Sequence, residues 1–233
     1  MEIRPLLLGH RGARAVKSIP ENTLASFDFA LSAFCDGFEF DVRLTADGQP
    51  VLRHDARVRG LEILKCSARK LRLPFLRDVV SRYQRTAFLD IELKDPGLEA
   101  ITVDLLHSVP PARGFVVSSF LPGVLEKVHG IDSGIPLGLI CETPRQLERF
   151  ADLRVDYGIF HHRLVRKELI ERMRAAAKKI FVWTVNSTAD MKRFSRWGAD
   201  GIISDDPRVL ALTLHQEITF GRKTPGVLSR QID

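Results

Sequence analysis

The fold is decided by residues 37–55, which read GFEFDVRLTADGQPVLRHD. The first six residues are apolar and β-prone, except for two carboxylates, Glu39 and Asp41. Side chains at positions i and i+2 of a strand point to the same face, so these carboxylates share one face. Like charges on one face favour a cation between them, and a metal ion is the simplest candidate. The alternative is an edge strand whose polar face lies in water.

The second half of this stretch predicts that the chain turns back. An Asp-Gly turn and only a few other residues separate Val42 from the apolar run Pro50–Leu52. A parallel crossover needs a dozen or more residues, so the two runs are expected to form an antiparallel hairpin. The hairpin would return His54 and Asp55 to the side of the first strand.

Composition predicts a globular protein without a membrane span. The 233 residues suit one large α/β domain, and no run of eighteen apolar residues occurs. The first nine residues do not match a signal peptide. The three cysteines stand far apart, with no CxxC motif, which is typical of free thiols in a reducing cytoplasm. We therefore expect a cytoplasmic protein with no stable membrane insertion.

The chain is basic, with a formal net charge of +6. We interpret the arginines as spread along the chain, without a long basic block, so a solvated basic surface is the first interpretation. Attraction to anionic substrates is the second. Nucleic-acid binding is not expected, because clustered basic residues with interleaved aromatics are absent.

Outside the hairpin, β-like and helix-like segments alternate eight times. The β-like runs are 3–9, 37–42, 87–93, 114–118, 136–141, 157–160, 180–185 and 200–204. The helix-like stretches are 22–34, 74–83, 98–107, 122–128, 144–150, 165–177, 188–197 and 207–215, and a basic connector occupies 57–72. Eight such units predict a (β/α)₈ TIM barrel with a β-hairpin excursion after the second strand, whereas a doubly wound open sheet rarely has so many. We expect one domain over residues 1–215 and a C-terminal tail over 216–233.

Active sites of such barrels lie at the carboxyl ends of the strands. These ends carry His10 and Arg11, the Glu39/Asp41 pair, His54, Glu92 and Lys94, and later Ser118–Ser119, His161–His162, Trp183–Asn186 and Ser204–Asp206. Three carboxylates from adjacent strands would suit Mg²⁺ or Ca²⁺ better than zinc. Histidines near such an ion can act as general acid and base, and two cations fit a phosphate. Together these groups favour phosphodiester cleavage.

Each residue also has a structural interpretation. A lone His10 or His54 is more often a hydrogen-bonded structural histidine, and Lys94 could pair with a neighbouring carboxylate. Their shared position on one barrel face argues against that interpretation. No chemistry requires His161 and His162, and for these two the structural interpretation is preferred.

The motifs resemble those of the glycerophosphodiester phosphodiesterase family. The resemblance spans about residues 8–207 and rests on HRG (10–12), PENT (20–23), ExDV (39–42), TxDG (45–48) and VxxHD (51–55), followed by IExK (91–94), SSF (118–120), WTVN (183–186) and DGIISDxP (200–207). The first block of motifs is highly specific, whereas the later ones would be weak alone.

The resemblance implies a (β/α)₈ barrel that hydrolyses a glycerophosphodiester to glycerol 3-phosphate and an alcohol. Matched by position, its divalent-metal ligands are Glu39, Asp41 and Glu92, and its acid/base pair is His10 and His54. Arg11 and Lys94 match groups that contact the phosphate, and Trp183 is expected to contact the substrate. The expected partner is thus a small-molecule phosphodiester, and the oligomeric state is left open.

Two departures from the family pattern stand out. Family members have a longer insertion after the His-Asp motif than residues 56–73, which predicts a more open pocket, and Ser204 replaces a common threonine. Two alternative functions remain. One is lysophospholipase D-type cleavage of a lysophospholipid, and the other is a non-catalytic barrel that binds phosphoesters.

Overall fold

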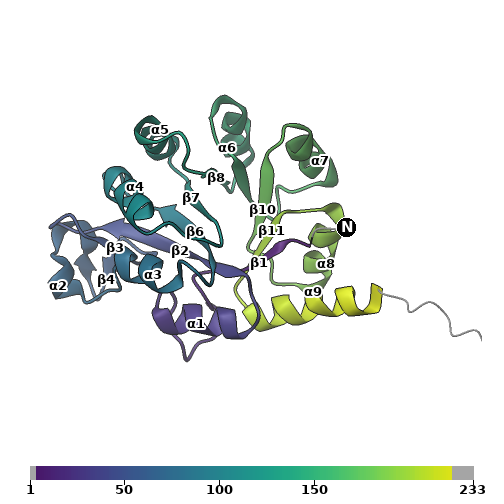
Figure 1. The fold of residues 1–233 in the computed structure, drawn as a ribbon, viewed down its shortest axis with the longest axis horizontal. Helices are drawn as coiled ribbons and strands as arrows, with labels where there is room; N and C mark the ends of the chain where they lie inside the picture. The colour runs from purple at the N-terminus through teal and green to yellow at the C-terminus, as the bar shows by residue number, and fades with distance from the viewer. Residues whose placement is uncertain (1–3, 222–233) are drawn as a thin grey trace, which may run out of the picture.

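A computed structural model describes residues 4–221, and it has the predicted barrel (Figure 1). The barrel strands are β1 (Leu6–Gly9), β2 (Gly37–Leu44), β6 (Phe88–Leu93), β7 (Phe115–Ser119), β8 (Leu137–Cys141), β9 (Tyr157–His161), β10 (Lys179–Trp183) and β11 (Gly201–Ser204). They pair in parallel in this order, and β1 pairs with both β2 and β11, which closes the sheet. Closure confirms the (β/α)₈ fold and excludes the open sheet.

A helix packs outside the barrel after each strand. These helices are α1 (Leu24–Ser32), α3 (Leu76–Tyr83), α4 (Glu99–Ser108), α5 (Pro122–Ile131), α6 (Pro144–Glu148), α7 (Lys167–Ala175), α8 (Thr188–Trp197) and α9 (Pro207–Gly221), and a short 3₁₀ turn, η2 (Arg149–Asp152), follows α6. Thr23 caps α1 through a reciprocal capping box with Ser26. Helix α9 continues past the expected end at residue 215, into the segment interpreted as a tail. Residues 222–233 of that tail lie outside the described residues.

The predicted hairpin is present. Strand β3 (Pro50–Leu52) pairs antiparallel with the end of β2, with Val42 opposite Leu52. Strand β2 is an interior strand, with β1 on one side and β6 on the other. The edge-strand interpretation of Glu39 and Asp41 is therefore wrong.

The connector after the hairpin is a small folded lobe, which the sequence interpretation missed. It contains β4 (Arg57–Val58), β5 (Leu61–Glu62), η1 (Ile63–Lys65) and α2 (Ala68–Leu71). Its own apolar cluster includes Val51, Val58, Ile63 and Leu71. The lobe itself has few apolar residues, at irregular spacing, and they pack around Val51 of the hairpin.

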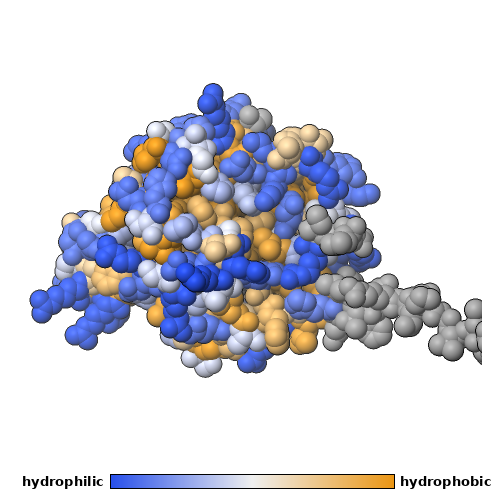
Figure 2. Space-filling view, in the orientation of Figure 1, coloured by the Kyte–Doolittle hydropathy of each residue, from blue (hydrophilic) through white to orange (hydrophobic). Residues whose placement is uncertain are grey.

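The lobe also concentrates the charge of the chain. Residues 53–72 contain seven Lys or Arg and two Asp or Glu, a net +5 of the chain's +6. Figure 2 shows hydrophilic side chains over this end of the molecule, where β4 and α2 lie. The basic residues are thus less evenly spread than the sequence interpretation held.

Two apolar layers fix which face of each strand carries the chemistry. Outside the barrel, Phe38 and Phe40 of β2 pack against Phe27 of α1, and the rings of Phe27 and Phe38 stack with centroids 4.2 Å apart. Inside, Phe181 packs against Phe88 and Tyr157, with ring centroids 5.7 and 5.1 Å away. Alternate residues of a strand face opposite sides, so the two carboxylates of β2 point into the barrel, above the packed rings of Phe88, Tyr157 and Phe181.

Within residues 4–221, none of the helices has the length and apolar character needed to cross a membrane. The three cysteines, Cys35, Cys66 and Cys141, are free thiols. The cytoplasmic location stays a prediction.

Candidate active site

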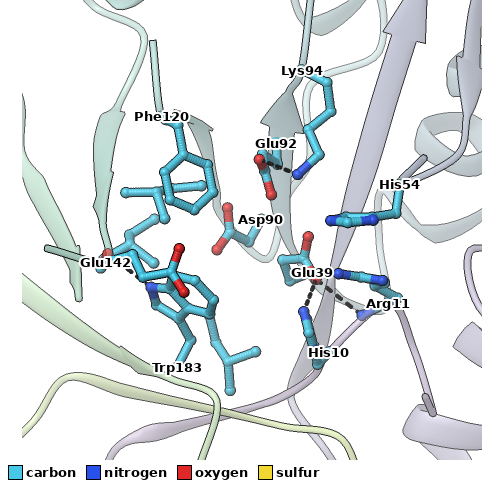
Figure 3. A pocket seen from close by; sticks show the side chains of 13 residues that line it. His10, Arg11, Glu39, His54, Asp90, Glu92, Lys94, Phe120, Glu142 and Trp183 are labelled. Atoms are coloured by element: carbon cyan, nitrogen blue, oxygen red, sulfur yellow. Dashed lines mark hydrogen bonds and ion pairs between the residues drawn. The ribbon is translucent and has the colours of Figure 1, made fainter. Parts of the chain in front are cut away.

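A cavity of about 410 Å³ opens at the carboxyl end of the barrel (Figure 3). It is lined by His10, Arg11, Glu39, His54, Asp90, Glu92, Lys94, Phe120, Ile140, Glu142, Ile159, Trp183 and Ile203. Seven of the eight residues predicted for the site are in this lining. The eighth, Asp41, is buried directly behind it at 1% exposure.

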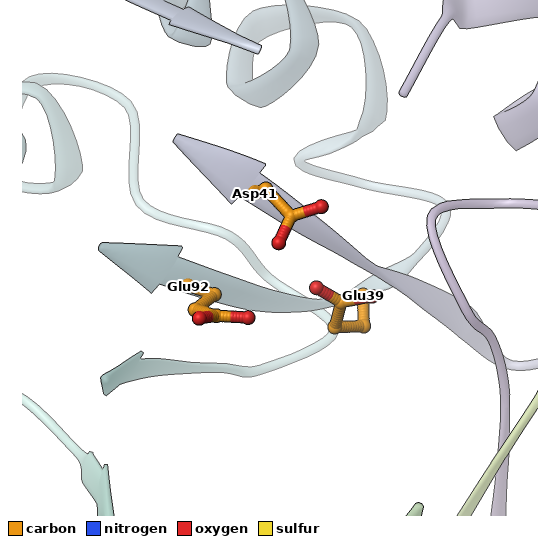
Figure 4. A group of neighbouring side chains, drawn as sticks. All are labelled: Glu39, Asp41 and Glu92. Carbon is orange, nitrogen blue, oxygen red and sulfur yellow. The ribbon is translucent and has the colours of Figure 1, made fainter. Parts of the chain in front are cut away.

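Glu39, Asp41 and Glu92 form one cluster (Figure 4). Each offers a carboxylate oxygen within 4.8 Å of the others, and all three residues are buried. The sheet register brings them together, because Asp41 of β2 pairs with Glu92 of β6. Oε1 of Glu39 and Oδ1 of Asp41 are buried without a hydrogen-bond partner among the described residues, although Asp41 Oδ1 forms an ion pair with Lys94. Three buried carboxylates, one with an oxygen that nothing in the described part of the chain satisfies, form a suitable ligand set for a hard divalent cation.

The pKa values of the three carboxyls differ in direction. Burial, together with the charges of Asp41 and Glu92, raises the pKa of Glu39 well above its usual range. Burial and the charge of Asp41 raise the pKa of Glu92 to about 8. Burial acts in the same direction on Asp41, but Lys94 and Arg11 outweigh it and hold its pKa at about 2. A divalent cation at this point would offset the burial and the repulsion that raise the pKa of Glu39 and Glu92.

The two predicted phosphate-binding cations lie on the cluster itself. Lys94 Nζ is 2.6 Å from Glu92 Oε1 and 3.0 Å from Asp41 Oδ1. Arg11 Nε is 3.2 Å from Asp41 Oδ2, and the backbone N–H of Arg11 donates to Glu39 Oε2 at 3.0 Å. Both side chains are largely buried and lie at the cavity wall. They can donate to an anion in the cavity without leaving the carboxylates.

The two predicted acid/base histidines are each held by a carboxylate. His10 Nδ1 lies 2.6 Å from Asp205 Oδ1, and its Nε2 is 3.8 Å from Glu39 Oε2. His54 Nδ1 lies 2.9 Å from Asp55 Oδ1. Partial burial lowers the pKa of His54, although the charge of Asp41 and the bond to Asp55 act against this. A carboxylate on Nδ1 leaves Nε2 of each ring available for proton transfer.

Two important residues were missed or misread in the sequence. Asp205 was noted only as part of a strand end, although it orients His10. Asn22 was placed at the start of the first helix-like stretch, but α1 begins at Leu24 and Thr23 is its N-cap. Asn22 instead donates from Nδ2 to Asp41 Oδ2 at 2.8 Å and accepts from the Asp41 backbone N–H at 3.1 Å. Its position in the PENT motif was the one signal for such a role.

A further buried carboxylate, Asp90, was also missed. It precedes Glu92 by two positions on β6 and so faces the same cavity. Ser118 donates to Asp90 Oδ1 at 2.6 Å, and burial raises the pKa of Asp90 to about 7. The period of the strand could have identified it.

Across the cavity from the histidines, Trp183 and Phe120 form an aromatic wall (Figure 3). Their ring centroids are 5.7 Å apart at 85°, and Trp183 Nε1 donates to the carbonyl of Ile159 at 3.1 Å. His161 packs edge-on against Trp183 at 5.2 Å and His162 packs against His161, but neither is among the residues that line the cavity. Both histidines thus have the packing role that the structural interpretation favours.

Comparison with known proteins shows which proteins this chain resembles. The sequence model of the Glycerophosphoryl diester phosphodiesterase family matches residues 10–94 and 90–209. The chain is 31% identical to a glycerophosphodiester phosphodiesterase of Caldanaerobacter subterraneus, over 89% of this chain and 97% of the relative. It is 30% identical to a putative glycerophosphodiester phosphodiesterase of Bacillus subtilis, over 86% and 94%. An Oleispira antarctica phosphodiesterase, solved with its product sn-glycerol-3-phosphate, superposes with a TM-score of 0.80 at 25% identity, over 91% of this chain and 97% of that one.

Proposed function

The chain belongs to the glycerophosphoryl diester phosphodiesterase family, and we propose that it hydrolyses glycerophosphodiesters to glycerol 3-phosphate and an alcohol with the help of a divalent metal and two histidines. Its class as a phosphoric diester hydrolase follows from the family match. It follows also from relatives named as glycerophosphodiester phosphodiesterases, which the chain matches over nearly their whole length. The observation that supports the finer mechanism is the convergence of three buried carboxylates and two carboxylate-held histidines on one cavity.

We assign the metal to Glu39, Asp41 and Glu92. Their all-oxygen donor set suits Mg²⁺ or Ca²⁺, and Oε1 of Glu39, which is buried without a hydrogen-bond partner among the described residues, is a group that an ion would satisfy. When bound, such an ion supplies positive charge to the phosphate oxygens and stabilises the charge that develops in the transition state.

The side chains around the ion provide the remaining chemistry. Arg11 and Lys94 can donate to the phosphate from the cavity wall. His54 acts as the base that takes a proton from the nucleophile, because its lowered pKa keeps the ring neutral near pH 7. His10, whose Nδ1 is held by Asp205, then protonates the leaving alkoxide. Trp183 and Phe120 form the opposite wall of the cavity.

A substrate and metal panel tests the proposal. The purified chain is incubated with glycerophosphocholine or glycerophosphoethanolamine and Mg²⁺ or Ca²⁺, with and without chelator, and released glycerol 3-phosphate is measured. We expect turnover that a chelator abolishes and the metal restores. Full activity of the Glu39→Ala/Asp41→Ala double variant would remove the metal assignment, and unchanged turnover of His54→Ala would remove the acid/base assignment.

A lysophospholipid is a second candidate substrate, and one observation favours testing it. The cavity has an apolar side, formed by Ile140, Ile159 and Ile203 together with the aromatic wall. Lysophosphatidylcholine is therefore included in the panel. Its cleavage to choline, with the acyl chain retained on glycerol phosphate, would show that the cavity admits a lipid diester.

A further inference from the structure

One charged side chain in the cavity, Glu142, makes no hydrogen bond or ion pair to another side chain within residues 4–221 and has no role in the proposed reaction, although its charge acts on the neighbouring His161. Glu142 directly follows β8, and its carboxylate lines the cavity. Its backbone N–H donates to Gln146 Oε1 at 2.9 Å, and Thr143 caps helix α6 through a capping box with the same glutamine. The turn that carries Glu142 is thus fixed, while no hydrogen bond or ion pair to another described residue engages its carboxylate.

The place of Glu142 in the cavity is specific. Figure 3 shows its carboxylate on the side of Phe120 and Trp183, facing the two histidines across the cavity. The aromatic pair is rigid, because Trp183 donates to a backbone carbonyl and packs edge-to-face with Phe120. The Phe120 ring already has a cation near its face, with Lys94 Nζ 5.6 Å from its centroid. Aromatic faces beside a carboxylate are the features that bind organic ammonium groups.

The cations on the opposite wall of the cavity pair with the carboxylates of the cluster and not with Glu142. Lys94 forms ion pairs with Asp41 and Glu92. The backbone N–H of Arg11 donates to Glu39, and its side chain forms an ion pair with Asp41. Three ligand carboxylates, two cations and a divalent ion carry a net +1, which one phosphodiester neutralises. Glu142 is exposed and lies close enough to His161 to act on its charge, and a positive charge on the substrate would add a favourable contact with it.

We propose that Glu142, Phe120 and Trp183 form a subsite for the trimethylammonium group of the leaving alcohol, so that the enzyme prefers glycerophosphocholine to glycerophosphodiesters of neutral alcohols. This inference rests on the proposed function. It adds a specificity-determining residue, Glu142, which acts on the alcohol and not on the phosphate. A quaternary ammonium has no hydrogen-bond donors, so it suits a site made of ring faces and one carboxylate.

The first test compares kcat/KM for glycerophosphocholine with that for glycerophosphoglycerol, whose alcohol is neutral. The partly exposed site should give a preference of about five- to tenfold, as expected for a cation–π contact assisted by one carboxylate. Glu142→Gln should lower the ratio about two- to fivefold, the part that one exposed carboxylate adds to the cation–π contact, and leave kcat/KM for glycerophosphoglycerol unchanged, which also shows that the variant is folded. Glu126→Gln, on the outer surface of α5 and away from the cavity lining, removes the same charge and should keep the preference.

A second test measures binding without turnover. Choline is titrated into the enzyme with metal present, and the fluorescence of Trp183 is followed in a Trp197→Phe background, since the chain has two tryptophans. Choline should change the signal and glycerol should not, and Glu142→Gln should weaken choline binding about two- to fivefold. Lysophosphatidylcholine in the kinetic panel shows whether the choline comes from a free diester or a lipid.

The outcomes separate this inference from the proposed function. Equal hydrolysis of both diesters by the wild type, or an equal loss on both with Glu142→Gln, would overturn the subsite; the second result would show that the carboxylate binds the glycerol shared by both substrates. Absence of turnover on every glycerophosphodiester would instead overturn the proposed function.

Discussion

The Nδ1 atom of His10 lies 2.6 Å from Oδ1 of Asp205, a carboxylate 195 positions further along the chain. Asp205 is itself fixed, because Asn186 Nδ2 donates to its Oδ2 at 2.8 Å and Arg14 lies 3.3 Å from the same oxygen. Burial acts to raise the pKa of Asp205, but the hydrogen bond and charge of His10 hold it at about 2. Asp205 is therefore ionised throughout the range in which the enzyme is assayed, and it fixes the orientation of the His10 ring.

Replacement of this carboxylate should slow turnover without weakening substrate binding. We expect Asp205→Asn to lower kcat by about 10- to 100-fold, the range found when an orienting carboxylate behind a histidine is removed. KM should change little, since Asp205 is not among the residues that line the cavity. Asp206→Asn is the matched control, because Asp206 accepts from the backbone N–H groups at the start of α9. Equal losses in kcat and 1/KM would contradict a positioning role.

The pH dependence should follow His54. Partial burial lowers its pKa below the ordinary value of 6.5, so the neutral ring, which can accept a proton, persists to a more acidic pH than usual. Activity should therefore be full near pH 7 and decline only below pH 6.5, as the ring becomes protonated. The profile of kcat/KM against pH at saturating metal measures this. An acidic limb centred above pH 7 would contradict the base role of His54.

Binding of the metal should stabilise the fold. Burial, together with repulsion among the three carboxylates, raises the pKa of Glu39 and Glu92, and a bound ion would stabilise their charged forms. At a concentration of about 100 times Kd, the ion should add about 2.7 kcal/mol to the free energy of unfolding. Thermal unfolding with Mg²⁺, Ca²⁺ or chelator measures the shift. The Glu39→Ala/Asp41→Ala double variant should show no shift, and a shift that persists in it would place the metal elsewhere.

Asn22 should couple stability to metal affinity. Its buried side chain makes two hydrogen bonds to Asp41, and its backbone has φ 57°, a conformation that suits Asn and Gly. Asn22→Ala should cost about 1–3 kcal/mol of unfolding free energy and raise the Kd of the metal about 10- to 100-fold. Asn22→Gly removes the same bonds without the backbone strain. It should be less destabilising in denaturant titrations but equally poor in metal binding, and wild-type affinity in either variant would contradict this role.

The barrel and the carboxylate cluster could be predicted because both depend on local patterns. Alternation within β2 placed Glu39 and Asp41 on one face, and the short spacing to Pro50–Leu52 required a hairpin. Glu92 followed from the same alternation on the next barrel strand. Each inference needed only the period of a strand and the rule that active sites lie at the carboxyl ends of barrel strands.

The partners of these residues could not be predicted in the same way. Asp205 reaches His10 only because β11 pairs with β1 and closes the barrel, with Ser204 opposite Gly9. Asn22 reaches Asp41 through a loop with a left-handed backbone, which leaves no periodic pattern. Glu142 is one exposed glutamate among many until the cavity is known.

Strand β2 should also be sensitive to a small steric change at its first residue. Gly37 begins this strand and lies between Leu8 of β1 and Phe88 of β6. A Cβ at Gly37 would lie 1.9 Å from the carbonyl oxygen of Phe88, a backbone atom that cannot move without disturbing the sheet. Gly37→Ala should therefore destabilise the protein by at least about 3 kcal/mol in denaturant titrations, at or above the upper end for overpacking.

The same change should weaken the metal site, because the displaced end of β2 carries Glu39 two positions later. Gly130→Ala on helix α5 is the control, since a Cβ there meets nothing within 4 Å. That substitution should stabilise the protein by up to about 1 kcal/mol, as alanine does in a helix. Wild-type stability of Gly37→Ala would show that the two strands can separate here, and the close pairing of β2 with β6 would not be what fixes the carboxylates.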